Sequence, residues 1–127
     1  MNNPPNPNKE IMVCVTGQRS CDRLINRGMA RREPNQKMHV VHCVQTGHRF
    51  MNRLNEPDAI DYLFTAAQLA NANLLMLRTD NVDDALVEFA KEHDVGIIVM
   101  GASPDAANSI ITRLQRRLPN VEFDVVV

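Results

Sequence analysis

A short segment near the start of the chain has the residue types of an anion-binding turn. Residues 11–15 (IMVCV) form an apolar run, and the segment after it consists of Thr16, Gly17, Gln18, Arg19 and Ser20. Ser20 can cap a helix that begins after it. Free N–H groups at such a helix start attract anions, and Arg19 adds a positive charge. The segment therefore predicts a phosphate or another anion at residues 16–20.

Histidines and a cysteine gather around a second apolar run, residues 38–44 (MHVVHCV), with His48 shortly after it. Strand side chains alternate between faces, so His39 and Cys43 point to one face and His42 to the other. No CxxC or HExxH spacing occurs. The pattern predicts no metal site, and we expect a helix to cover His39 and Cys43.

Four arginines follow one another at every fourth position, which places them in one stripe on a helix. They are Arg19, Arg23, Arg27 and Arg31. The stripe has two interpretations: an anionic ligand or acidic partner docks on it, or it is a solvated face. Arg19 is the stronger ligand candidate because it is nearest to the turn.

The chain has three cysteines, Cys14, Cys21 and Cys43, and therefore no fully paired disulfide set. Cys14 lies inside the first apolar run and is expected to be a buried small hydrophobe. Cys21 lies in the first turn of a helix, where the thiol pKa falls, so a redox role and a packing role are both open. Reduced thiols and the lack of a signal-peptide pattern favour a cytoplasmic location.

Composition excludes several classes of protein. The 127 residues are 44% hydrophobic and 23% charged, with net charge -1 and no Trp. This balance indicates a globular protein that binds neither nucleic acid nor a membrane. Residues 1–9 are polar and proline-rich and are expected to be a disordered arm before one domain, residues 10–127.

Strand and helix patterns alternate through that domain. Strands are expected at residues 11–15, 38–44, 73–77, 96–100 and 121–127, and helices at 21–33, 58–72, 82–90 and 110–118. This order predicts an α/β fold, a doubly wound five-stranded parallel sheet with helices on both faces. Ligands bind such sheets beyond the carboxyl ends of the strands. Residues 16–20 and 101–105 should line that edge.

Several segments resemble a universal stress protein domain. They are VCVTGQRSCDRLINRG, ALVEFAKEHDV, GIIVMGAS and NSIITRLQRRLPNVEFDVVV. The resemblance covers nearly the whole chain after the arm and is greatest to the version inside osmosensitive potassium-channel sensor kinases. It implies the Rossmann-like fold of the adenine-nucleotide alpha-hydrolases, strand order 3-2-1-4-5, frequent dimerisation and, in some members, ATP binding.

The features by which members of this family bind ATP are only half present. Those members carry an Asp after strand one, where this chain has Thr16, and a glycine series after strand four, of which only Gly101 remains. Asn108 and Ser109 stand near the place of the last Gly-Ser pair, after a shortened loop. Glycines let backbone N–H groups approach phosphate, whereas Pro104 donates no hydrogen bond. We therefore expect a degenerate crevice and no catalysis, with weak ATPase activity as the enzymatic alternative.

A second motif of the sensor-kinase domains binds cyclic di-AMP. It pairs Ser-x-Ser with a distal Phe-Thr-Ala-x-Tyr, and these fall here on Thr16 to Gln18 and on His39 to Cys43. The resemblance therefore adds cyclic di-AMP to ATP and AMP as candidate ligands. The full set of candidate ligand-binding residues is Thr16, Gly17, Gln18, Arg19, Ser20, His39, Val41, Gly101, Ala102, Ser103, Asn108 and Ser109.

The last apolar segment would form an edge strand with nothing after it. Its alternating residues are Val121, Phe123, Val125 and Val127. An apolar edge invites pairing with another chain, and the resemblance implies the same, so we expect a homodimer through this strand. Three function classes remain open: a nucleotide-binding regulatory module, a ligand-free module that docks a regulatory protein partner, and an enzyme.

Overall fold

The computed structural model describes residues 9–15, 21–46, 56–102 and 110–127. Along the chain the elements are β1 (Glu10–Val15), α1 (Cys21–Arg31), β2 (Met38–Gln45), α2 (Glu56–Leu69), β3 (Asn73–Thr79), α3 (Val82–Glu92), β4 (Val95–Gly101), α4 (Ile110–Arg117) and β5 (Glu122–Val126). The strands form one parallel sheet in the order β3-β2-β1-β4-β5. The predicted fold class and strand order are confirmed.

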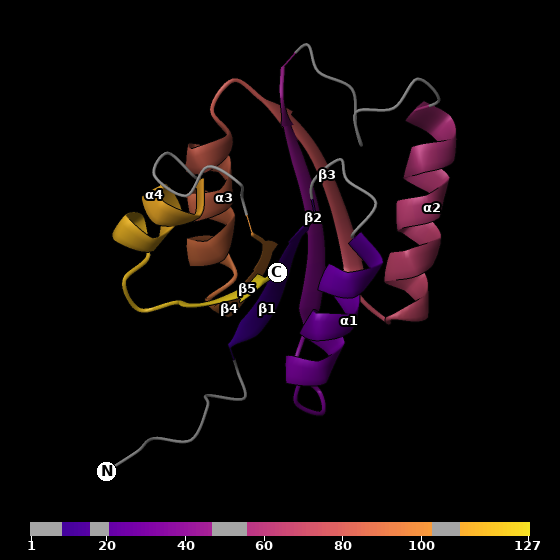
Figure 1. Ribbon diagram of the computed structural model, residues 1–127, viewed down its shortest axis with the longest axis horizontal. Coiled ribbons are helices and arrows are strands. Elements are labelled where there is room, and N and C mark those ends of the chain that lie inside the picture. Colours follow the sequence, from indigo (N-terminus) through magenta and orange to yellow (C-terminus); the bar gives the residue numbers. More distant parts are fainter. Residues whose placement is uncertain (1–8, 16–20, 47–55, 103–109) are drawn as a thin grey trace.

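Helices α1 and α2 cover one face of the sheet, and α3 and α4 cover the other (Figure 1). The central strand β1 is apolar from Ile11 to Val15 because both faces of the sheet are covered there. Ile11 and Val13 belong to the core under α1 and α2, whereas Met12 and Cys14 belong to the core under α3 and α4. A strand covered on both faces has no polar face to show in its sequence.

The helix ends follow local rules. Asn81 caps α3, because its side-chain oxygen accepts a hydrogen bond of 3.0 Å from the Asp84 N–H. Asn71 follows α2 at φ 52°, and Asp94 follows α3 at φ 50°. Asn and Asp tolerate this left-handed conformation better than most residues, so they end helices where no glycine is present.

Helix α1 lies unusually close to the sheet at Gly28. A Cβ atom at this position would lie 2.6 Å from Val13 Cγ2 and 3.0 Å from Met38 Sδ. The helix therefore needs a residue without a side chain here. This contact fixes the height of α1 above β1 and β2.

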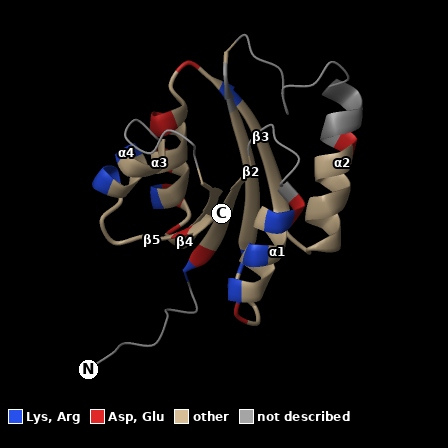
Figure 2. Cartoon of the chain, in the orientation of Figure 1, with Lys and Arg blue, Asp and Glu red and all other residues tan. Residues whose placement is uncertain are grey.

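The arginine stripe of α1 binds the last strand of the same chain. Arg27 Nη1 lies 2.8 Å from Asp124 Oδ1, and Arg31 contacts Asp124 Oδ2 at 3.0 Å and Glu122 Oε2 at 2.6 Å. Arg23 donates to the Val127 carbonyl oxygen. The Asp124 side chain is only 10% exposed, so this is a half-buried network rather than a surface pair. Figure 2 marks the basic positions along α1 in blue.

This network corrects both interpretations of the stripe. Three of its arginines pair with β5 or with the residue that follows it, so the acidic partner of the stripe is a strand of the same chain, and Arg23 and Arg27 also remain exposed to solvent. The hydrogen bond to Glu122 raises the pKa of Arg31, partial burial lowers it, and the bond to Asp124 raises it again. Arg19 lies outside the described residues.

The described helices include none that is long and apolar enough to cross a membrane.

Candidate functional site

The order in which the strands are added to the sheet reverses between β1 and β4. From β1 the chain continues to β2 on one side, whereas β4 and then β5 lie on the other side. Strand β1 ends at Val15 and β4 at Gly101. Helix α1, which follows β1, covers one face of the sheet, and α4, which follows β4, covers the other (Figure 1). Doubly wound sheets bind ligands at such a point. Thr16, Gly17, Gln18, Arg19, Ser20, Ser103, Asn108 and Ser109 lie outside the described residues.

Two predicted site residues, Gly101 and Ala102, do lie at this edge. Gly101 is the last residue of β4 and pairs with Val126. The Ala102 N–H donates to the Val126 carbonyl oxygen at 2.8 Å, so β5 already uses this donor. The Ala102 side chain is exposed. A Cβ atom on Gly101 would meet Leu24 methyl groups at 3.9 Å, an ordinary contact, so packing alone does not require a glycine there.

A buried histidine supports the same edge from inside. His42 Nδ1 lies 2.8 Å from the carbonyl oxygen of Val15, the last residue of β1. A carbonyl only accepts, so Nδ1 carries the proton. Burial lowers the pKa of His42, and the bond to Val15 partly offsets this. A neutral His42 thus anchors the end of β1 directly before the predicted anion turn. In the sequence, only the position of His42 on the strand points to this hydrogen bond with Val15.

The structure separates His39 and Val41 from the crevice. Val41 lies in mid-strand, 1% exposed, and packs in the core under α3 and α4. His39 is the second residue of β2 and pairs with Met12 and Asn73, at the amino end of the sheet. Both residues therefore leave the candidate site. In a parallel sheet only residues near the end of a strand reach its carboxyl edge.

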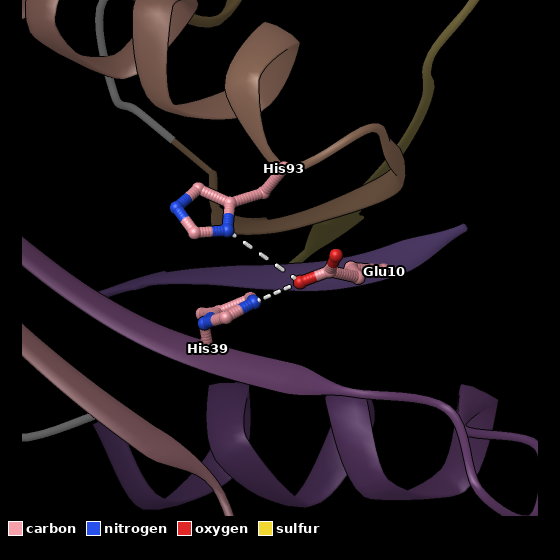
Figure 3. Close-up of side chains that lie close together, drawn as sticks. All are labelled: Glu10, His39 and His93. Atoms are coloured by element: carbon pink, nitrogen blue, oxygen red, sulfur yellow. Dashed lines mark hydrogen bonds and ion pairs between the residues drawn. The ribbon is translucent and has the colours of Figure 1, made fainter. Parts of the chain in front are cut away.

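At the amino end His39 meets two residues from other elements (Figure 3). Its Nε2 is hydrogen-bonded to Glu10 Oε1, and the same oxygen lies 3.6 Å from Nδ1 of His93. Glu10 opens β1, and His93 is the C-cap residue of α3. The His39 side chain is 7% exposed and the His93 side chain 38%. Sequence reasoning missed Glu10 and His93, because neither has a partner at a recognisable spacing.

Phe89 of α3 holds the two imidazole rings in place. Its ring stacks on His93 at a centroid distance of 4.2 Å and an angle of 28°, and meets His39 edge-on at 5.2 Å. Helix α3 therefore covers His39, as the strand pattern predicts, and Cys43 packs against the core under the same helix.

The described cysteines have the properties of core residues. Burial raises the pKa of the Cys14 thiol to about 12, with a smaller contribution from the charge of Cys43. Burial also raises the pKa of Cys43. Cys14 is 4% exposed, which confirms it as a buried small hydrophobe. The Cys21 side chain lies outside the described part of the chain, so its redox role stays a prediction.

Known proteins resemble this chain in structure but not in sequence. No protein-family model matches it, and no curated protein sequence matches it. A universal stress protein from Archaeoglobus fulgidus superposes with a TM-score of 0.69 at 19% identity, covering 94% of this chain and 93% of the other. The chain therefore has the fold of universal stress proteins.

Two further similar structures contain nucleotides. A universal stress protein in complex with cAMP has a TM-score of 0.60 at 20% identity, with 94% of each chain covered. The Archaeoglobus fulgidus protein in complex with dAMP has a TM-score of 0.66 at 18% identity, with 94% of this chain and 98% of the other covered. At these identities the similarity establishes the fold alone.

Proposed function

We propose that this chain is a universal stress protein-like regulatory module that binds an adenine nucleotide and catalyses no reaction. The nucleotide binds in a degenerate crevice beyond the carboxyl ends of β1 and β4. The observation that carries the proposal is the strand order. The order reverses between β1 and β4, and these two neighbouring strands end at Val15 and Gly101. Two proteins of the same fold hold cAMP and dAMP.

A ligand with one phosphate group fits the chemistry of this edge better than a triphosphate. The Ala102 N–H is already bound by β5, and Pro104, which has no N–H, stands where the family has a glycine. The other candidate donors are the N–H groups of residues 16–20, the Arg19 guanidinium, and the side chains of Ser103, Asn108 and Ser109. They suffice for a single phosphate group, as in AMP or cAMP. The small number of hydrogen-bond donors would not stabilise a γ-phosphate, which argues against ATP hydrolysis.

Two alternatives follow from the same fold. In one, the ligand is ATP or cyclic di-AMP, as the resemblance to sensor-kinase domains implies. The displacement of His39 and Val41 from the crevice removes two positions on which the cyclic di-AMP motif would depend. In the other, the module has lost its ligand and docks a regulatory protein.

A thermal-shift screen tests the proposal with ATP, ADP, AMP, cAMP, dAMP, cyclic di-AMP and inorganic phosphate. A ligand that binds only the folded state raises the melting temperature. We expect AMP, dAMP or cAMP to raise it, and Arg19→Ala to abolish the effect. Ala102→Glu should weaken binding at least tenfold, because it adds a negative charge beside the phosphate.

The matched control for the second variant is Ala30→Glu. Ala30 is also exposed, but it lies near the carboxyl end of α1, away from the crevice. The control should bind like the wild type. No shift with any of these compounds would refute the nucleotide module and leave the ligand-free docking module as the account.

We also propose a homodimer through β5. This strand is the sheet edge beside β4. Its residues Phe123 and Val125 and the preceding Val121 are only partly buried, and Val127, which follows it, is 92% exposed. Val125→Lys should convert the dimer to a monomer in size-exclusion chromatography with light scattering. Leu69→Lys, at an exposed position of α2, should remain dimeric. An unchanged mass for Val125→Lys would exclude this interface.

A further inference from the structure

The amino end of the sheet carries a group of metal-ligating side chains that the crevice does not use. Glu10, His39 and His93 come from the start of β1, the start of β2 and the end of α3. Each offers one ligand atom, and the three atoms lie within 4.8 Å of one another. Within the described ranges this is the one set of three such residues.

The ring nitrogens of His39 and His93 both face one carboxylate oxygen of Glu10 (Figure 3). Glu10 Oε1 lies between the two rings, bonded to His39 Nε2 and 3.6 Å from His93 Nδ1. Bonds of about 2.0–2.1 Å to Zn²⁺ in a tetrahedron separate the ligand atoms by about 3.4 Å. The Glu10 and His93 atoms are already near this separation. An ion among the three requires Glu10 to turn away from His39 and the two ring nitrogens, which lie within 4.8 Å of each other, to move closer together.

A neighbouring amide can prepare His39 for metal binding. The Asn73 side-chain nitrogen lies 3.4 Å from His39 Nδ1. If the carboxamide turns over, its oxygen accepts the Nδ1–H and Nε2 keeps its lone pair for the ion. Metal-bound histidines usually donate their second ring nitrogen in this way. Phe89 restricts the orientation of both rings.

The donor set and its exposure indicate which ion fits. Two imidazoles and one carboxylate suit Zn²⁺, whereas Ca²⁺ and Mg²⁺ prefer oxygen ligands alone. Glu10 and His39 are largely shielded, at 19% and 7% exposed, while His93 is 38% exposed and leaves an approach for water. We propose that Glu10, His39 and His93 bind one Zn²⁺ ion, with water completing its coordination.

The ion would join three elements that are distant in sequence. Zn²⁺ bound to the folded chain and not to the unfolded one raises the stability of the fold by mass action. The site lies at the opposite end of the sheet from the crevice. Its existence is therefore independent of whether a nucleotide binds.

Metal titration of the full chain tests the site. Protein stripped of metal by a chelator is titrated with Zn²⁺ by calorimetry, and with Co²⁺ by visible absorption, which reports the coordination geometry. We expect one ion per chain, the absorption bands of a low-coordinate Co²⁺ centre, and a higher melting temperature with Zn²⁺. Glu10→Gln and His93→Ala should each weaken Zn²⁺ binding at least tenfold.

Asp94→Asn is the matched control. It also converts a carboxylate to an amide, next to His93, but Asp94 is exposed and pairs with Lys9 at 3.4 Å. Asn tolerates the positive φ of this position, so the control should fold and bind Zn²⁺ normally. Circular dichroism checks the fold of each variant. If His93→Ala does not fold, His93→Gln takes its place.

Two results would overturn the site. The first is a wild-type chain that binds neither Zn²⁺ nor Co²⁺, which would leave Glu10 and His39 as a simple hydrogen-bonded pair. The second is Zn²⁺ binding of unchanged affinity in folded Glu10→Gln and His93 variants, which would place the ion elsewhere on the chain.

Discussion

The two ends of the parallel sheet differ in how they are built. The carboxyl edge follows from where strands stop, at Val15 and Gly101, and can be located along the chain. The amino end brings together Glu10, His39 and His93, which no local pattern connects. His39 and His42 show the difference on one strand. They are about 10 Å apart along β2, yet one contacts Glu10 and the other the end of β1.

The position of a residue along its strand therefore determines which end of the sheet its side chain can reach. The expected strand at residues 38–44 already places His39 near its start, and alternation assigns the face of its side chain. The resemblance to the cyclic di-AMP motif places His39 in the crevice instead. The register between neighbouring strands shows which residues it meets. In β2 that register pairs His39 with Met12, near the start of β1, and His42 with Val15 at its end.

The largest expected effect compares packing at two glycines, Gly28 of α1 and Gly101 of β4. Gly28→Ala should lower the free energy of unfolding by about 1–2 kcal/mol, because the new methyl would press on Val13 and Met38 and outweigh the gain in helix propensity. Gly101→Ala should change it by less than about 0.5 kcal/mol, since its methyl meets Leu24 at an ordinary distance. Urea unfolding measures both. Equal effects would show that α1 has room to move at Gly28.

The next effect concerns the arginine network on β5. Asp124→Asn should cost about 1 kcal/mol, because a largely buried carboxylate that accepts from both Arg27 and Arg31 loses its charge. Glu122→Gln should cost less, since the Glu122 side chain is 57% exposed and its ion pair is screened by water. The reverse order in urea unfolding would show that Asp124 is not the centre of the network.

The smallest effect at neutral pH involves titration of His42. Its pKa in the folded chain lies below the ordinary value of 6.5, so below that pH the unfolded chain binds more protons than the folded one. Stability from this residue is therefore complete above pH 6.5 and is lost as the pH falls toward the folded pKa, by at most about 1.4 kcal/mol per pH unit.

His42→Asn should reduce this acid-dependent loss, because the amide can still donate to Val15 but does not titrate. The comparison uses the slope of unfolding free energy against pH, so any cost of the substitution at neutral pH does not enter. An identical slope in both proteins would assign the acid sensitivity to other groups.

Some features of this protein follow from the sequence alone. The apolar runs and their spacing determine the five strands, the alternating helices and the parallel sheet, because each element must bury a face of its own. They also determine that Cys14 is buried and that β1 and β4 end at the same edge of the sheet. The repeat of four places the arginines on one side of α1.

Tertiary structure alone decides what those side chains meet. Arg27 and Arg31 contact Asp124 only because the crossovers bring distant segments together. The same holds for Glu10, which contacts both His39 and His93. Periodicity is a property of one element and its own core, whereas these contacts depend on strand order, register and the height of α1 over the sheet. Those quantities are set by the packing of the whole chain, so no single segment of the sequence contains them.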